Sequence, residues 1–289
     1  MSGGAPRILV TGAGGQLGGE LVRTLAPLGH LVACDRTGLD VSDRAAVTAQ
    51  VDAARPHFIV NAAAYTAVDR AETEAAQAEA VNVRGASNLA REAARTGAVL
   101  MHFSTDYVFD GEQSTPYGED APTQPLNVYG RTKRDGECAI VDAHCAHLIL
   151  RTSWVYGRRG SNFLLTMQRL GRERTELRVV DDQRGVPNWT RDLAGAVAAL
   201  VGRGRDALAE CSGVYHLSAP GEASWFEFAQ AIFAGAAVPR LVPITTADYP
   251  TPARRPRYGV LDSGRIERTF GIALPHWRDA LARCLAAVD

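Results

Sequence analysis

The chain has 289 residues, of which 46% are hydrophobic, and its 31 basic and 32 acidic residues give a formal net charge of −1. This length and apolar content suffice for one large domain or two. The near-neutral balance leaves no basic footprint for nucleic acid or an anionic membrane, and no apolar run approaches the roughly 18 residues of a membrane span. The composition therefore indicates a globular protein with no nucleic-acid or membrane partner.

The cysteines and the first residues bear on where the protein works. Five cysteines are scattered without a CxxC pair, and the seven histidines show no metal-ligand spacing. The opening MSGGAPRILV lacks the basic region and long apolar core of a signal peptide. These features predict reduced thiols, no metal site and a cytoplasmic location.

Short apolar runs alternate with helical patterns along the first half of the chain. Strands are expected at 7–11, 31–35, 57–62, 98–104 and 147–151, and helices at 17–25, 74–95 and 128–142. The second half predicts helices at 162–172, 191–202 and 224–233, a strand at 213–217 and a proline-rich loop at 249–259. Unbroken apolar runs between helices are typical of a parallel sheet covered on both faces.

We therefore expect an α/β fold: a Rossmann-type doubly wound parallel sheet with a smaller C-terminal substrate-binding lobe. The first domain is predicted to cover residues 1–155 and the lobe residues 156–289. Some segments of the second half, such as 190–204, are expected to return to the first domain.

A glycine-rich turn follows the first expected strand, in the sequence TGAGGQLGGE. Gly12, Gly15 and Gly18 stand at a strand-to-helix junction, where glycine permits a tight turn and close approach of a pyrophosphate to the backbone. The following helix directs its free N–H groups at the phosphates. Asp35, about 20 residues on, can accept from ribose hydroxyls, whereas Arg36 can instead pair with a 2′-phosphate. The sequence thus predicts a dinucleotide site and leaves NADH and NADPH open.

Lys133 is the only lysine in the chain, and it lies four residues after Tyr129. On a helix, this spacing places both side chains on one face. A tyrosine that gives a proton to a carbonyl near neutral pH must become more acidic than its ordinary pKa of about 10, and a neighbouring ammonium favours the phenolate. A compact, flexible lysine suits this task better than the planar fork of arginine. The pair therefore predicts a reductase in which Tyr129 is the proton donor.

A third polar group is expected where the fourth strand ends, in HFSTDYVFDG. Ser104, Thr105 and Asp106 lie at the carboxyl end of that strand, where ligands bind in parallel sheets. The Thr105 hydroxyl can hydrogen-bond a substrate carbonyl.

With these motifs, the chain resembles the extended short-chain dehydrogenase/reductases and, more closely, the dTDP-4-dehydrorhamnose reductases. The likeness runs almost from end to end. It includes NAAAYTAVDRAE (61–72), STDYVFDG (104–111), PLNVYGRTK (125–133), RTSWVYG (151–157), NF (162–163), DDQRGVP (181–187) and YPTPARRP (249–256).

The resemblance implies roles for individual residues. Tyr129 would protonate O4 of a dTDP-4-keto-6-deoxysugar while NADPH or NADH delivers hydride to C4, with Lys133 lowering the pKa of the tyrosine and Thr105 orienting the carbonyl. The expected cofactor residues are Gly12, Gly14, Gly15, Gln16, Leu17, Gly18, Asp35, Arg36, Asp40, Val41, Ala62, Ala63, Ala64, Tyr65, Ser104, Tyr129 and Lys133. The expected substrate residues are Thr105, Asp106, Tyr107, Trp154, Asn162 and Arg255.

One departure from the family concerns a metal. Some members bind magnesium at a dimer interface through three glutamates, of which the first matches Glu20. The other two positions are Arg191 and Arg278, and cations cannot coordinate a hard metal. We therefore expect a monomer or a metal-independent dimer.

A second departure concerns the sugar. The proline-rich loop continues as RYG (257–259) where the family often has an Asn-Ser pair, and Asn188 and Trp189 stand where small residues are common. Both changes are expected on the sugar-nucleotide side. Reduction of another dTDP-4-keto-6-deoxysugar therefore stays an alternative, as do a non-catalytic regulatory homologue and an epimerase with tightly held NAD.

Overall fold

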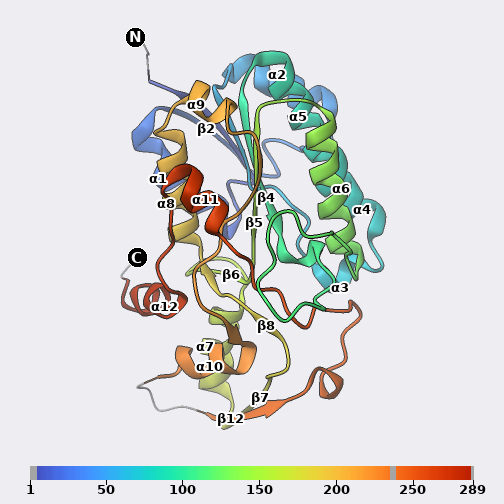
Figure 1. Cartoon of the computed structure of the whole chain (residues 1–289), viewed down its shortest axis with the longest axis vertical. Helices are drawn as coiled ribbons and strands as arrows, with labels where there is room; N and C mark the ends of the chain where they lie inside the picture. The colour runs from blue at the N-terminus through green and yellow to red at the C-terminus, as the bar shows by residue number, and fades with distance from the viewer. Residues whose placement is uncertain (1–4, 235–238, 288–289) are drawn as a thin grey trace.

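The computed structural model describes residues 5–234 and 239–287. A parallel six-stranded sheet occupies the upper part of the molecule in Figure 1, in the order β10-β5-β4-β3-β1-β2. The strands are β1 (Arg7–Thr11), β2 (His30–Cys34), β3 (Phe58–Asn61), β4 (Val99–Thr105), β5 (His147–Thr152) and β10 (Gly213–His216). Because β2 and β3 flank β1 on opposite sides, the strand order reverses between β1 and β3, which is where ligands bind in open α/β sheets.

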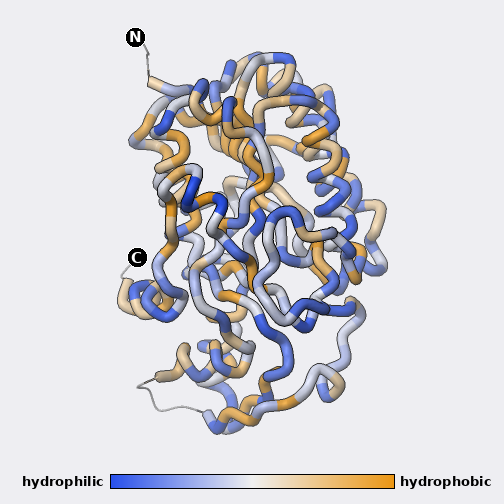
Figure 2. Tube along the Cα trace, viewed as in Figure 1, coloured by the Kyte–Doolittle hydropathy of each residue, from blue (hydrophilic) through white to orange (hydrophobic). Residues whose placement is uncertain are grey.

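Helices cover both faces of this sheet. One face carries α1 (Gln16–Leu25), α8 (Thr190–Val201), α9 (Arg205–Ala209) and α11 (Gly264–Phe270), and the other carries α2 (Arg44–Ala54), α5 (Ala86–Thr96) and α6 (Val128–Asp142). Successive strand residues alternate between the two cores: Ile8 and Val10 face the first, and Leu9 faces the second. Figure 2 shows the hydrophobic segments gathered along the sheet. The expected doubly wound α/β fold is thus confirmed.

A smaller lobe lies below the sheet in the view of Figure 1. Its helices are α7 (Phe163–Glu173), α10 (Trp225–Ile232) and α12 (Trp277–Ala286). Its two-stranded pairs join β7 (Glu176–Val180) with β12 (Arg240–Ile244), β8 (Arg184–Gly185) with β11 (Ala223–Ser224), and β6 (Val155–Tyr156) with β9 (Asn188–Trp189). Aromatic residues such as Tyr156, Phe228 and Trp277 form a separate core here.

The chain crosses between the two parts more than once. Helix α8 packs its buried residues Leu193, Val197 and Leu200 into the sheet core, and β10 pairs with β5 at the sheet edge. The boundary at residue 155 stays a prediction. Within the described parts of the chain, no helix is long and apolar enough to cross a membrane.

Most expected elements agree with the structure to within one or two residues, and the differences have physical causes. The expected helix at 74–95 is divided into α4 (Ala75–Glu79), a π-helical segment η2 (Ala80–Gly85) and α5. Helix α2 was not expected from the sequence, although Asp43 caps it by accepting from the backbone N–H groups of Ala45 and Ala46. The β7–β12 ribbon was also missed, since its two strands are more than 50 residues apart.

Short segments complete the framework: η1 (Ala26–Leu28), α3 (Val68–Ala71), η3 (Asp106–Val108) and η4 (Thr246–Asp248). Two of them, α3 and η3, lie close to the candidate site described below.

Candidate active site

A cavity of about 570 Å³ opens where β1, β2 and β3 end. It is lined by Gly12, Gly14, Gly15, Asp35, Arg36, Asp40, Val41, Ala62, Ala63, Ala64 and Tyr65, all expected at a cofactor site. The structure adds Thr37, Leu39, Ser42, Gln77, Ala80 and Val81. The last three come from α4 and η2, whose sequence carries no nucleotide-binding signal.

Glycine is required in the turn between β1 and α1. Gly12 has a φ of 73°, and a Cβ there would lie 2.5 Å from the backbone nitrogen of Ala63. Gly15 is the N-cap residue of the ten-residue helix α1. Because it is a glycine, no N-cap side chain accepts from the first N–H groups of the helix. A backbone this close to the cavity wall, with a helix N-terminus behind it, suits a pyrophosphate.

Asp35 directly follows β2, and its side chain stabilises the turn that comes next. Its Oδ1 accepts from the backbone N–H of Thr37 and Gly38, at 2.9 Å each, and from the Thr37 hydroxyl at 2.7 Å. These hydrogen bonds lower the pKa of Asp35, and the bond from the Thr37 hydroxyl has the largest effect. The carboxylate is therefore ionised, and Asp35 lines the cavity, where ribose hydroxyls are suitable donors.

Several expected cofactor residues do not line this cavity. Leu17 is buried in the sheet core, and Gly18 packs against Gly12, whose carbonyl oxygen would lie 2.0 Å from an added Cβ. Gln16 donates to the carbonyl of Val155. The Ser104 hydroxyl donates to the buried carboxylate of Glu137. Their predicted contact with a cofactor stays a prediction.

Helix α6 begins where the sequence predicted and carries Tyr129 in its first turn. The Asn127 side chain caps it by accepting from the Gly130 N–H at 2.8 Å, and Glu72 accepts from the N–H of Val128. A Cβ on Gly130 would lie 2.1 Å from the Tyr107 carbonyl oxygen, so this glycine lets α6 approach η3 closely. The helix start thus places Tyr129 beside the end of β4.

The Thr105 side chain lies close enough to Tyr129 to influence the pKa of its phenol. Tyr107 packs edge-on to the Tyr129 ring, with centroids 5.6 Å apart. Burial raises the pKa of Tyr129 to about 12, and the Thr105 hydroxyl acts in the opposite direction. Tyr129 is therefore a protonated phenol at neutral pH.

The expected lowering of the Tyr129 pKa by Lys133 is not what the structure shows. Lys133 is 2% exposed, and its Nζ donates to the Phe103 carbonyl at 2.7 Å and lies 3.0 Å from His102 Nε2. Its side chain is thus held against β4. Burial lowers the pKa of Lys133 to about 8, while the charge of Glu137 acts against this. A buried amine that readily loses its charge is a weak electrostatic partner for a phenolate.

Asp106 completes the polar group at the end of β4. The Thr105 hydroxyl donates to its Oδ1 at 3.0 Å, while its buried Oδ2 has no partner within the described structure. A Cβ on Gly259 would lie 2.5 Å from that oxygen. Burial raises the pKa of Asp106 to about 7, with the Thr105 hydrogen bond opposing the rise. A buried carboxyl oxygen without a partner is available to a substrate hydroxyl.

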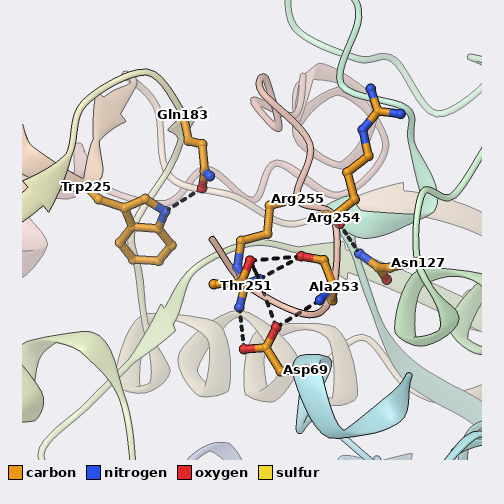
Figure 3. A network of polar contacts seen from close by, with 8 residues as sticks. All are labelled: Asp69, Asn127, Gln183, Trp225, Thr251, Ala253, Arg254 and Arg255. Carbon is orange, nitrogen blue, oxygen red and sulfur yellow. Dashed lines mark hydrogen bonds and ion pairs between the residues drawn. The ribbon is translucent and has the colours of Figure 1, made fainter. Parts of the chain in front are cut away.

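A second cavity, of about 740 Å³, lies in the smaller lobe between α7, β7 and the proline-rich loop. Arg255 stands at one end, where Nη1 and Nη2 bind Asp69 of α3 at 3.0 and 2.8 Å. Its Nη1 also donates to the Thr251 hydroxyl at 2.6 Å. Figure 3 shows this network, and it also shows the Trp225 indole N–H donating to Gln183 Oε1. Arg255 thus fastens the loop, and its predicted contact with a substrate stays a prediction.

Two further predicted substrate residues have structural contacts of their own. Trp154 has a φ of 43° and stacks on Trp225 with ring centroids 3.5 Å apart. Asn162 caps α7 by accepting from the Leu165 N–H and donates to the carbonyl of Gly157. The predicted binding of a sugar by Trp154 and Asn162 stays a prediction.

The residues that depart from the family pattern fall in two places. Glu20 accepts from Arg23 at 2.8 Å, and Arg191 Nε lies 3.6 Å from the same carboxylate. The expectation that Asn188 and Trp189 lie on the sugar-nucleotide side stays a prediction. Both are buried: the Asn188 amide bonds the backbone of Ser153 and Ala219, and Trp189 packs in the core of the lobe.

A doubly wound sheet, a glycine turn under a cavity at its switch point and a tyrosine–lysine pair at the end of β4 define an extended short-chain dehydrogenase/reductase. The family model described as "RmlD substrate binding domain" matches residues 6–289. The dTDP-4-dehydrorhamnose reductase of Burkholderia thailandensis is 47% identical over 96% of this chain and 98% of its own length, and that of Escherichia coli is 42% identical, with 96% of each covered. The chain belongs to the dTDP-4-dehydrorhamnose reductase family.

Solved structures agree. The dTDP-4-dehydrorhamnose reductase of Bacillus anthracis, crystallised in complex with NADP, superposes with a TM-score of 0.92 at 38% identity, covering 97% of this chain and 98% of that one. The likeness thus extends over both parts of the molecule.

Proposed function

We propose that this protein reduces the C4 keto group of dTDP-4-dehydro-L-rhamnose to give dTDP-L-rhamnose, with NADPH or NADH as the reductant. The observation that carries the proposal is the protonated Tyr129, beside Thr105 at the end of β4, in a chain of this family. A bound nicotinamide supplies the hydride. The residues of the turn after β1, with Asp35 and the alanines after β3, would hold the dinucleotide.

The chain's own residues supply the rest of the chemistry. Tyr129 gives its phenolic proton to O4 as the negative charge develops there. The Thr105 hydroxyl lies near the phenol and is held by its hydrogen bond to Asp106, so it can help to position the carbonyl oxygen. The second cavity, with Arg255 and Trp225 on its walls, would hold the nucleoside diphosphate.

The test is a matched pair of enzymes. Purified wild-type protein and Tyr129→Phe are mixed with dTDP-4-dehydro-L-rhamnose and NADPH or NADH, and oxidation of the nicotinamide is followed by absorbance. We expect turnover by the wild type and a loss of roughly 10²–10⁴-fold in the variant, the usual contribution of a placed general acid. Binding of NADPH to the variant, measured by calorimetry, serves as the control for folding. Equal turnover by both proteins would contradict the mechanism.

A second candidate keeps the chemistry and changes the sugar, and the observation that favours it is Tyr258. Tyr258 belongs to the segment 257–259 that departs from the family pattern, and its hydroxyl donates to Glu222 at 3.3 Å. Parallel assays with other dTDP-4-keto-6-deoxysugars decide between the substrates by kcat/KM. An isomerised sugar without net oxidation of NAD(P)H would identify an epimerase, and binding without turnover would identify a regulatory homologue.

A further inference from the structure

A row of polar side chains crosses three strands at the switch point and ends at Lys133. Thr11 of β1 and Asn61 of β3 are register partners, and Asn61 is in turn the partner of His102 in β4. Their side chains are joined: the Thr11 hydroxyl donates to Asn61 Oδ1 at 2.7 Å, and Asn61 Nδ2 lies 2.8 Å from His102 Nδ1. His102 Nε2 then meets Lys133 Nζ at 3.0 Å. All four side chains are buried.

The direction of these hydrogen bonds follows from one backbone group. The N–H of Ala63, which can only donate, points at Asn61 Oδ1 from 3.0 Å. The Asn61 amide is therefore oriented with its oxygen toward Ala63 and its NH₂ toward His102. Because an NH₂ group donates, His102 Nδ1 must accept, and a neutral imidazole then carries its proton on Nε2.

The consequence falls on Lys133. An ammonium has three donors and no acceptor, so it cannot receive the Nε2–H of His102, whereas an uncharged amine can. The amine also keeps an N–H for the Phe103 carbonyl. Protonation of His102 does not change this, because a charged ring still presents Nε2–H, and burial and Lys133 lower the pKa of His102 well below its ordinary value. The other charged group near Lys133 is Glu137, whose carboxylate binds Arg151 at 2.9 and 2.6 Å.

We propose that Asn61 and His102 are positioning residues that present a hydrogen-bond donor to Lys133, and so hold this lysine ready to give up its proton beside Tyr129. The inference rests on the proposed function for its purpose: the ammonium form of Lys133, which the donor destabilises, can pass one proton to the Tyr129 phenolate after each turnover. The lysine is then left as the neutral amine that accepts from His102, and it regains a proton from water before the next turnover. The direction of the relay is itself independent of any substrate. The lowered pKa of Lys133 agrees with it.

Asn61→Asp is expected to reverse the direction of the hydrogen bonds that run from Asn61 through His102 to Lys133. A carboxylate can accept from Thr11, from Ala63 and from His102 Nδ1–H, which moves the ring proton to Nδ1 and turns Nε2 into an acceptor for the lysine ammonium. Thr11→Val is the matched control, because it removes one partner of Asn61 while Ala63 still fixes the amide.

The lone lysine makes the measurement direct. Protein labelled with ¹³C at lysine Cε gives one side-chain resonance from the chain, and its shift against pH reports the pKa of Lys133. We expect a rise of about one pH unit or more in Asn61→Asp, the order of effect that a new favourable partner has on a buried charge, and no change in Thr11→Val. The high-pH limit of kcat is expected to move in the same direction.

Nitrogen shifts of ¹⁵N-labelled histidine separate reversal of the relay from the mere addition of a charge. The His102 signal, assigned by its loss in His102→Gln, should show the proton on Nε2 in the wild type and on Nδ1 in Asn61→Asp. A proton on Nδ1 of His102 in the wild type would overturn the inference even if Asn61→Asp does not fold. An unchanged Lys133 pKa in a variant whose His102 tautomer has reversed would also overturn it. Neither result depends on turnover, so failure of the proposed function would be seen separately, as absence of NAD(P)H oxidation.

Discussion

Asp106 should lower the stability of this protein at neutral and alkaline pH. Its carboxyl is 2% exposed, burial raises its pKa to about 7, and one oxygen lacks a partner in the described structure. When the folded-state pKa lies above the unfolded one, the folded state binds more protons between the two values. Stability therefore falls as pH rises from about 4 to about 7, and the whole cost remains above pH 7.

The magnitude follows from the two pKa values. An ordinary aspartate has a pKa of about 3.9, so a rise to about 7 corresponds to about 4 kcal/mol at pH 8 and to about 1.5 kcal/mol at pH 5. Asp106→Asn keeps the shape and the oxygen that accepts from Thr105, and it removes the charge. We expect the variant to be more stable than the wild type by up to about 4 kcal/mol at pH 8, with the difference falling to about 1.5 kcal/mol at pH 5.

Urea unfolding of both proteins at pH 5 and pH 8, followed by far-ultraviolet circular dichroism, measures this difference. Asp110→Asn is the matched control with the opposite sign. The Tyr117 hydroxyl, followed by the Glu112 N–H, lowers the pKa of Asp110, so its removal should cost stability at pH 8. If wild type and Asp106→Asn differ equally at the two pH values, the reasoning about Asp106 is refuted.

Three further outcomes are expected. Lys133→Arg should be less stable than the wild type, and its folded fraction should lose kcat by roughly a hundredfold or more, the order of an essential acid–base partner, because a guanidinium stays charged at every working pH. Near-normal turnover would remove the argument built on this residue. Arg255→Ala should raise KM for the dTDP-sugar more than it lowers kcat, because a contact remote from C4 is made in ground and transition states alike. The control is Arg254→Ala, which removes an exposed arginine and should change neither constant. An unchanged KM in Arg255→Ala would place the diphosphate elsewhere. Activity and association state, measured by assay and light scattering, should be insensitive to EDTA because Glu20 is already engaged by arginines; magnesium-dependent dimerisation would contradict this.

The sheet could be predicted because buried parallel strands leave a strong pattern. RILVT and its successors are unbroken apolar runs, and α6 is bounded by Asn127, whose side chain caps it. The ribbon of β7 and β12 left no such pattern. β7 alternates exposed and buried residues over only four positions, β12 shows no such alternation, and their pairing joins segments more than 50 residues apart. Local sequence does not encode a long-range pairing of this kind.

The candidate site was predictable where chemistry depends on local spacing. Tyr129 and Lys133 are one helical turn apart, and Thr105 is the last residue of a strand, so each could be recognised in its own segment. His102 could not, because its role depends on Asn61, 41 residues earlier, through a sheet register that only the fold creates. For the same reason the sequence could not indicate that Lys133 faces β4, and the expectation of a lowered Tyr129 pKa failed there.

The structure also explains why this position stays lysine in a chain whose other 30 basic residues are arginine. Lys133 Nζ is buried against one acceptor, the Phe103 carbonyl, and against the Nε2–H of His102. Arginine would bring five N–H donors and a charge that no working pH removes. Each donor left without a partner in a buried site costs about 1–3 kcal/mol, and none of them could accept from His102. Packing and proton chemistry thus both require an amine here, while the remaining cations, which lie mostly on the surface, are free to be arginine.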